Sequence, residues 1–364
     1  MEVAARELLP ALRDAAPSVR FTAFLNRETA EADGPWQDIE SVTVPVHAEN
    51  RVEWVRGEQL LLPGAAQRAG CDLVHSLGST GPARGRFTRV VTVHDVIYKH
   101  FPEAHFGLRS LGMRALVPLA ARRSHRVIAD SGATRDDLVE LLSIPSEKID
   151  VVPLAARPPR VDPAPEVELR ARYDLGDRPL VLSTSAKRPH KNLLRLLDAH
   201  ALLTEPRPLL VLPGYPTEHE GELRQEAARL GITHDVRFLG WLAEDEVEGL
   251  LQAATCVAFP SLFEGFGLPV LEGMLRGVPV VCSARSSLAE VAGDAAMLVD
   301  PESPRSIADG IAAVLRDPEL ARDLVARGRE QAARFSWEAT AAGCLETYER
   351  ALAEAPTRRA LLRR

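Results

Sequence analysis

The chain has 364 residues, enough for two domains, and its 46% hydrophobic and 26% charged residues are ordinary for a globular protein. Its net charge of −7 excludes the strongly basic character of most nucleic-acid-binding proteins, so we expect no nucleic-acid partner. The sequence contains no apolar run of about 18 residues and no signal peptide, which predicts a cytoplasmic protein without a membrane-spanning helix.

The first half of the chain alternates between helical and strand patterns. Residues 1–13 carry apolar side chains at helical spacing, which predicts a helix at the start. Short runs rich in Val, Ile and Leu then predict parallel strands buried on both faces, at residues 21–26, 41–46, 72–77, 89–95, 125–131 and 149–154. This alternation predicts a doubly wound α/β domain over residues 1–157.

A proline-rich segment separates this half from a similar second half. Four prolines crowd the stretch that ends at Pro165, and neither a helix nor a central strand tolerates that density, so we expect an interdomain linker at residues 158–165. The alternation then resumes over residues 166–334, with a helix expected at 193–203. Strands are expected at residues 179–185, 209–214, 236–240, 256–260, 278–283 and 296–300. An amphipathic segment at residues 335–355 predicts a last helix.

Residues 259–274, FPSLFEGFGLPVLEGM, hold two carboxylates, Glu264 and Glu272, on either side of a glycine-rich loop. The apolar run before them predicts a strand. Pro269 suits the first turn of a helix, whose positive end favours an anion. The glycines of the loop let backbone N–H groups turn toward a ligand. The alternative is an ordinary strand–loop–helix junction that binds nothing, because glycine motifs alone are weak signals.

This string resembles the signature of retaining GT-B glycosyltransferases, in particular glycosyltransferase family 4, with its two glutamates separated by seven residues. The resemblance covers nearly the whole chain. It implies the GT-B fold, which is α/β with two Rossmann-like doubly wound domains and a cleft between them, and a last helix that returns to the N-terminal domain. It implies that Glu264 holds hydroxyls of the transferred sugar and that Glu272 binds the ribose. Donor diphosphate is then bound by main-chain amides of Gly265, Phe266, Gly267 and Leu268.

The string KRPHKN, which begins at Lys187, predicts a basic loop between a strand and a helix with Asn192 as its N-cap. Lys191 and Arg188 would place cations beside a helix N-terminus, which suits a diphosphate. The alternative is a solvated basic turn. The family resemblance implies that Lys191, and with it Arg188, contacts the donor diphosphate, although Ser185 stands where family members usually have glycine.

His94 and Asp95 close a predicted strand, and ligands bind at the carboxyl ends of strands in open α/β sheets. The alternative for His94 is a hydrogen bond within its own loop. The resemblance implies that His94 positions the donor sugar, while Asp95 either orients the imidazole or caps the turn. In the next landmark of the family, Ser131 caps a helix, and we expect Arg135 near the diphosphate.

Residues 239–255 resemble the segment in which main-chain groups at Trp241 and Leu242 hold the nucleobase. Glu244 or Asp245 could contact a guanine there, or could simply favour the first turn of a helix. Residues 106–126 have one apolar side and several arginines. This segment is either a helix packed on the core with solvated arginines, or a peripheral contact with the inner membrane surface.

The resemblance implies transfer of a hexosyl group, with retention, from a nucleotide diphosphate sugar to a saccharide or lipid-linked acceptor. The predicted catalytic residues are His94, Glu264 and Lys191. Mannose from GDP-mannose is the favoured donor sugar, in bacterial polysaccharide biosynthesis, with UDP-glucose and a TDP-deoxysugar as alternatives. We expect no cofactor and no metal, since the sequence has no Asp-X-Asp pair and its cysteines lack metal-binding spacing. Two of the four cysteines lie in apolar runs, which indicates buried thiols in a reducing compartment.

Proteins of this family begin with a strand and a glycine-rich loop, whereas Met1 already lies within the first expected helix. We therefore expect the first strand of the N-terminal domain to be missing, with a gap or a rearranged edge in its sheet. Either the start lies further upstream, or the chain is a truncated homologue that binds nucleotide without catalysis. A nucleotide-sugar 2-epimerase, which also has two Rossmann-like domains, is a further alternative.

Overall fold

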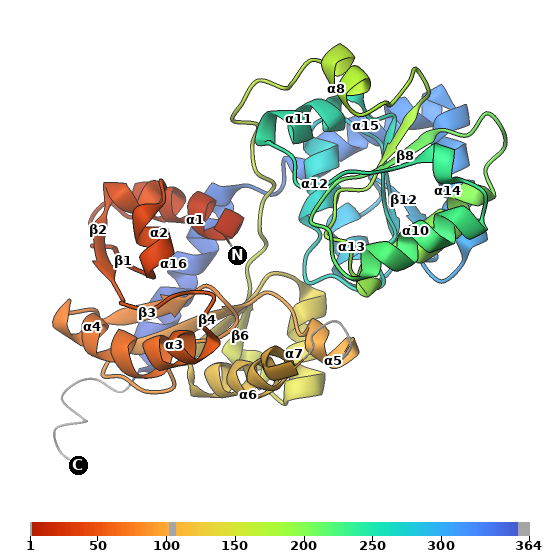
Figure 1. Ribbon diagram of the computed structural model, residues 1–364. Coiled ribbons are helices and arrows are strands. Elements are labelled where there is room, and N and C mark those ends of the chain that lie inside the picture. The colour runs from red at the N-terminus through yellow and green to blue at the C-terminus, as the bar shows by residue number, and fades with distance from the viewer. Residues whose placement is uncertain (1, 102–106, 356–364) are drawn as a thin grey trace. The chain divides into compact units, whose positions relative to one another are not determined.

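The computed structural model describes residues 2–101 and 107–355 of the chain (Figure 1). The chain divides into two compact units, each of them α/β. The first unit contains the residues up to Leu154 together with the chain from Ser336 onward, and the second unit is Ala155–Phe335. Within the described ranges, no helix is both long enough and apolar enough to cross a bilayer.

The strands of the first unit form two parallel sheets. Strands β1 (Thr22–Leu25) and β2 (Glu40–Thr43) pair with each other. The other sheet has the order β3-β4-β5-β6, made of β3 (Leu73–Ser76), β4 (Thr88–Val93), β5 (Arg126–Ala129) and β6 (Ile149–Val151). Every strand expected in this half is present. The two sheets share no ladder in the described residues, so the sheet has a gap, as the sequence predicted.

Helices of the first unit pack on these sheets. They are α1 (Glu2–Ala15), α2 (Arg27–Glu31), α3 (Arg51–Arg56), α4 (Leu62–Arg68), α5 (Ile97–His100), α6 (Gly107–Arg123), α7 (Gly132–Leu142) and α16 (Trp337–Glu354). A π-helical stretch, Gly57–Leu61, joins α3 to α4, and single 3-10 turns lie at Pro35–Asp38 and Ser146–Lys148. The helix predicted at residues 1–13 is therefore confirmed as α1.

Residues 106–126, for which we considered either a helix packed on the core or a contact with the membrane surface, contain α6. Residue 106 and the side chains of residues 107–111 lie outside the described part of the structure. Val117, Ala120 and Ala121 are buried in the core of the first unit with strands β4 and β5. Arg114 is exposed, and Arg122 donates to the carbonyl oxygen of Leu142 at 3.0 Å. These contacts agree with a helix packed on the core.

Strand order in the second unit is β12-β11-β10-β7-β8-β9, with every ladder parallel. This is the doubly wound Rossmann order, in which chain connections leave the two central strands in opposite directions. The strands are β7 (Leu180–Leu182), β8 (Leu209–Leu212), β9 (Val236–Phe238), β10 (Cys256–Phe259), β11 (Val280–Ser283) and β12 (Met297–Val299). Each corresponds to a strand predicted from an apolar run.

The helices of the second unit cover this sheet, and their apolar faces build one large core with the strands. They are α8 (Glu166–Arg172), α9 (Leu193–Ala201), α10 (His219–Arg229), α11 (Glu244–Ala253), α12 (Leu268–Leu275), α13 (Ser286–Ala292), α14 (Pro304–Arg316) and α15 (Pro318–Ala332). Two 3-10 turns lie at Pro189–Lys191 and Thr233–Asp235. Residues 158–165, expected to be a linker, contain no helix or strand.

The last helix, α16, belongs to the first unit, where it contacts α1, β4 and β5 (Figure 1). The Tyr348 hydroxyl lies 2.7 Å from Nδ1 of His75 on β3, and the other ring nitrogen lies 2.7 Å from the Thr92 hydroxyl. Burial, with a smaller contribution from the charge of His94, lowers the pKa of His75 to about 3. His75 is therefore a neutral link between β3 and α16 at neutral pH.

We predict that this link makes the first unit sensitive to acid. An unfolded chain takes up a proton at His75 below about pH 6.5, whereas the folded chain does not, so stability falls as the pH drops from about 6.5 toward 3. His75 should contribute a slope of up to ~1.4 kcal/mol per pH unit to the free energy of unfolding. Urea denaturation at about pH 7 and about pH 5 measures it.

In that experiment His75→Gln should flatten the pH dependence, because glutamine hydrogen-bonds without titrating. His234→Gln, at an exposed position of the second unit, is the matched control and should leave the slope unchanged. An equally steep slope in His75→Gln would show that other groups cause the acid sensitivity.

Candidate functional site

The candidate site of the second unit lies where the strand order of its sheet reverses. Strands β7 and β10 are neighbours in the centre of the sheet, and their carboxyl ends lie at the same edge. Connections leave these strands in opposite directions, and ligands of doubly wound sheets bind in the crevice that results. The basic loop follows β7 and the glutamate loop follows β10, so the fold brings together two motifs about 70 residues apart in sequence.

The side chain of Asn192 joins the two loops, a contact that the sequence did not predict. It precedes α9 with a left-handed backbone, φ 62° and ψ 29°, and its side chain makes no capping hydrogen bond. Its Nδ2 instead donates to the carbonyl oxygens of Pro260, at 2.9 Å, and Pro301, at 2.7 Å. Asn192 therefore occupies the predicted N-cap position, where its carbonyl oxygen accepts from the Leu196 N–H, but its side chain does not cap the helix. The left-handed backbone turns the amide away from the first turn of α9 and toward the ends of β10 and β12.

Lys187, to which the sequence analysis gave no role, is completely buried. Its Nζ donates to the carbonyl oxygen of Gly214 at 2.7 Å and to that of Leu239 at 2.9 Å, and lies 3.4 Å from Glu220. Burial lowers the pKa of Lys187, and the charge of Glu220 opposes this. This lysine therefore ties the loop after β7 to the loops after β8 and β9. Its place in a charged string gave no sign of burial.

The glutamate loop has the predicted form of strand, glycine loop and helix. Helix α12 begins directly after Gly267, with Pro269 in its first turn. Gly267 has φ 113°, and a Cβ at this position would lie 2.5 Å from Cδ2 of Leu288, so both the backbone and the packing require glycine. Glu264 is fixed through its backbone, which donates to the Ser286 hydroxyl and accepts from the Ser287 hydroxyl.

Phe266 packs inward and leaves only its backbone for a ligand. Its side chain is buried, and its ring lies edge to face with Phe335, 5.8 Å between centroids. The expectation that the loop acts through its amides is compatible with this packing. The N-terminus of α12 lies at the end of this loop, and the positive end of its helix dipole favours a negatively charged ligand.

The two loops meet in an ion pair. Nζ of Lys191 donates to Oε1 of Glu264 at 2.6 Å, and the two side chains are only 16% and 13% exposed. The same ammonium lies 5.1 Å from the centroid of the Phe259 ring. Two residues predicted to have separate roles, on phosphate and on sugar, are thus direct partners.

Glu272 lies within α12, beside a second group of charges. Arg276 pairs in bidentate fashion with Glu248, with an Nε–Oε2 distance of 2.6 Å, and both side chains are buried. Burial raises the pKa of Glu272, opposed by Arg276 and Arg157 and reinforced by Glu248. In the part of the chain that the structure describes, the Glu272 carboxylate has no hydrogen-bond partner.

The remaining predicted donor contacts lie at the same edge. Trp241 is 74% exposed and tilts against Tyr215, with centroids 5.0 Å apart, whereas Leu242 is buried. The half-buried Arg188 side chain forms no ion pair with the described residues. Helix α11 begins at Glu244, which agrees with the expectation of an acid in a first turn, and the Glu244 carboxylate lies 3.2 Å from Arg157.

In the first unit, His94 is held by both ring nitrogens. Nδ1 lies 2.6 Å from Oδ2 of Asp130, and Nε2 donates to the carbonyl oxygen of Leu77 at 2.7 Å. Burial lowers the pKa of His94, but the charge and hydrogen bond of Asp130 outweigh it and the pKa is raised. Asp95 caps the turn by accepting from the Ile97 N–H at 3.0 Å, so it does not orient the imidazole.

Asp130 is the residue that sequence reasoning missed. It follows β5 directly, as His94 follows β4, and these strands are parallel neighbours, which is the signal that could have paired them. The next residue, Ser131, caps α7 by accepting from the Thr134 N–H at 3.0 Å, as predicted. Arg135 is paired with its neighbour Asp136 at 2.7 Å.

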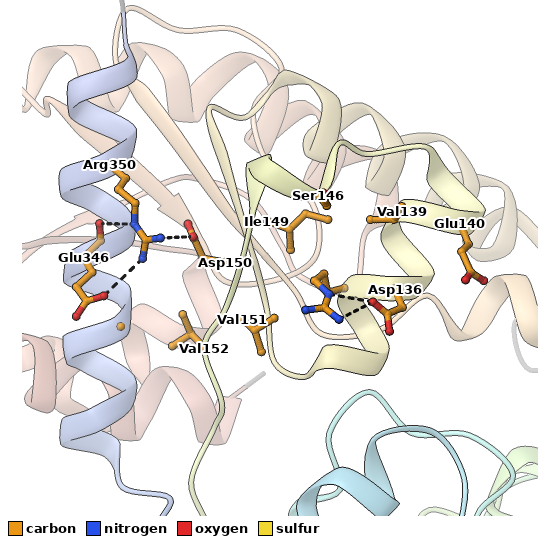
Figure 2. Close-up of a pocket in the computed structure, with 12 residues that line it drawn as sticks. Asp136, Val139, Glu140, Ser146, Ile149, Asp150, Val151, Val152, Glu346 and Arg350 are labelled. Carbon is orange, nitrogen blue, oxygen red and sulfur yellow. Dashed lines mark hydrogen bonds and ion pairs between the residues drawn. The ribbon is translucent and has the colours of Figure 1, made fainter.

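A pocket of about 600 Å³ lies in the first unit among α7, β6 and α16 (Figure 2). Arg350 reaches from α16 toward Asp150 and Glu346 (Figure 2). Asp150 also accepts from the buried Arg126 at 2.6 Å. Both arginines that line this pocket, Arg135 and Arg350, are therefore paired with carboxylates that also line it. None of the residues predicted to bind the donor lines it, except Arg135.

Comparison with known proteins identifies the family. The family described as glycosyl transferases group 1 matches residues 167–331, and glycosyltransferase family 4 matches residues 1–157. The chain is 32% identical to the O-antigen chain mannosyltransferase B of Escherichia coli over 265 residues, 71% of this chain and 70% of that protein. This chain belongs to glycosyltransferase family 4.

Solved structures of GT-B enzymes have the same fold. A sucrose-phosphate synthase from Thermosynechococcus elongatus matches with a TM-score of 0.77 and 21% identity, covering 97% of this chain and 94% of that one. Anabaena HepE, in complex with UDP and glucose, matches with a TM-score of 0.69 and 23% identity, covering 94% and 95%. The protein is therefore a glycosyltransferase with the GT-B fold, built from two Rossmann-like parallel-sheet domains.

We predict that Asn192 stabilises the candidate site through its two carbonyl contacts. Asn192→Ala should cost ~2–4 kcal/mol of unfolding free energy, since it leaves two carbonyls without a donor and keeps a left-handed backbone. Asn192→Gly should cost about 1 kcal/mol less, because glycine tolerates that backbone. Urea denaturation measures both.

The control is Asn50→Ala, which removes a true N-cap whose side chain accepts from the N–H groups of Val52 and Glu53. It should cost about 1 kcal/mol. Equal losses for Asn192→Gly and Asn50→Ala would mean that the contacts to Pro260 and Pro301 carry little energy.

Proposed function

We propose that this glycosyltransferase moves a mannosyl group, with retention, from a nucleotide diphosphate sugar to a saccharide or lipid-linked acceptor. The observation that carries the proposal is the Lys191–Glu264 pair beside the N-terminus of α12, at the switch point of the second sheet. The similarity to an O-antigen chain mannosyltransferase supports mannose, with GDP-mannose as donor. The HepE complexes with UDP and UDP-glucose support a nucleotide sugar as the donor class.

In this proposal the loops of the second unit stabilise the leaving diphosphate. Negative charge grows on it as the glycosidic bond breaks, and fixed donors stabilise such charge best. The amides of residues 265–268, the α12 N-terminus, Lys191 and Arg188 supply these donors. No metal is assigned a role, and activity that persists in excess EDTA is the expected result.

The remaining groups bind the rest of the donor. Glu264 accepts from sugar hydroxyls, while Glu272, whose carboxylate has no hydrogen-bond partner among the described residues, accepts from the ribose. Backbone groups at Trp241 and Leu242 hold the base, and His94 contributes from the first unit to positioning the sugar. We place the reaction in the cytoplasm, with a peripheral contact at the inner membrane surface where the acceptor is lipid-linked.

The direct test is a panel of labelled nucleotide sugars, scored for binding, slow hydrolysis and transfer. Binding to GDP-mannose is expected, and binding to none of them would contradict the proposal. A changed sugar after incubation with donor alone would identify a 2-epimerase. Binding without transfer to any acceptor would favour a non-catalytic nucleotide-binding protein.

We predict that Glu272→Ala raises the KM for the donor by ~10–100-fold, the loss expected for a hydrogen bond to a charged group, and changes kcat little. Steady-state kinetics with varied donor measures both. Glu319→Ala is the control, since this glutamate is 90% exposed on α15. Unchanged donor affinity in Glu272→Ala would rule out the ribose contact.

We predict that Lys191→Met, in contrast, lowers kcat by ~10²–10³-fold, because this charge acts on the leaving group as the bond breaks. Single-turnover rates at saturating donor measure the effect. Arg305→Met on α14, whose side chain is 74% exposed, should not change the rate. A purely KM effect in Lys191→Met would assign this lysine to donor binding alone.

A further inference from the structure

Residues that directly follow three neighbouring strands of the first unit are linked in a series of hydrogen bonds. Leu77 follows β3, His94 follows β4 and Asp130 follows β5, and the strands lie side by side in that order. Asp130 Oδ2 is 2.6 Å from His94 Nδ1, and His94 Nε2 is 2.7 Å from the Leu77 carbonyl oxygen. The Asp130 side chain is 2% exposed, and its other oxygen, Oδ1, has no hydrogen-bond partner among the described residues.

The geometry fixes one proton whatever the charge state of the pair. A carbonyl oxygen only accepts, so the proton between His94 and Leu77 must be on Nε2. Asp130 and Nδ1 share the other proton, and either assignment of it leaves Nε2 protonated. His94 is therefore a donor at Nε2 and has no free nitrogen that could act as a base.

Contacts with His94 also hold the loop after β3 in place. Ser79 in this loop has a left-handed backbone with φ 63°, which a non-glycine residue adopts only under constraint. Its hydroxyl accepts from the His94 N–H at 3.2 Å, and its own N–H donates to the Thr92 carbonyl oxygen at 2.9 Å. The hydrogen bond from the His94 ring to the Leu77 carbonyl oxygen adds to these two backbone contacts in holding the loop.

We propose that Asp130 is a positioning residue of the glycosyl transfer reaction, which holds His94 so that Nε2 always presents a proton at the carboxyl edge of the sheet. This rests on the proposed function, in which His94 positions the donor sugar. The group that Nε2 would meet is an oxygen with a free lone pair, such as a sugar hydroxyl, which takes the place of the Leu77 carbonyl. His94 thus orients a hydroxyl and does not remove its proton.

Other titratable groups face this pair and belong in the design of the test. His75 on β3 lies close enough for its pKa to be lowered by His94, and Cys344 on α16 has its pKa raised by burial and by Asp130. Tyr348, also on α16, is buried against His75. These groups stay neutral near pH 7, so an effect of Asp130 variants there belongs to the His94 pair.

Three variants separate the hydrogen bond from the charge. Asp130→Asn can still donate to Nδ1 and keep the proton on Nε2, so kcat/KM near neutral pH should stay within a few-fold. Asp130→Ala releases the ring, and kcat/KM should fall by ~100-fold, as for a small displacement in an active site. Asp137→Ala is the control, since Asp137 holds His100 in a partly exposed pair at 2.9 Å, and it should leave kcat/KM unchanged.

The ¹⁵N NMR spectrum of the histidine rings tests the inference on the free protein, without any transfer assay. Nε2 of His94 should be protonated in the wild type and in Asp130→Asn throughout the range of about pH 5–8. An unprotonated Nε2 in the wild type would overturn the inference, whether or not the Asp130→Ala protein folds. A folded Asp130→Ala enzyme of wild-type activity would overturn it as well. Absence of all transferase activity beside a protonated Nε2 would refute the proposed function alone.

Discussion

The order of strands in the second sheet is the constraint on which its candidate site depends. Because β7 and β10 are parallel neighbours, the loops that leave them start side by side, although their sequences are far apart. Asn192 then joins the ends of β10 and β12 to the basic loop, and Lys187 joins that loop to β8 and β9. This framework holds the two loops side by side, which allows the Lys191–Glu264 contact between them.

Most of the fold could be predicted because its strands are continuous apolar runs separated by polar turns. Parallel strands buried on both faces leave that pattern in any sequence. The division of the first unit's strands into two sheets was also expected, because the sequence lacks the strand with which proteins of this family begin. The placement of the glutamate motif was predictable for a local reason, since Gly267 and Pro269 specify a turn and a helix start by themselves.

What the sequence could not provide was the partner of each residue. Asn192 precedes a helix and has the composition of an N-cap, yet distant carbonyls determine its backbone and its contacts. Lys187 stands in a charged string but is buried, because the carbonyls that satisfy it come from loops about 27 and 52 residues further on. Asp130 directly precedes the predicted cap residue Ser131, and only the adjacency of β4 and β5 connects it to His94.

Both units hold a predicted site residue in close contact with a carboxylate, Lys191 with Glu264 and His94 with Asp130, each at 2.6 Å. A partly buried ion without a partner is costly, so each of these contacts stabilises the groups that it joins. A ligand that offered only phosphate would take Lys191 and leave the Glu264 carboxylate alone. A nucleotide sugar offers phosphate to the lysine and hydroxyls to the glutamate in one molecule, so it can replace both halves of the pair. In the proposed function, such a donor would therefore satisfy both charges of the pair at once.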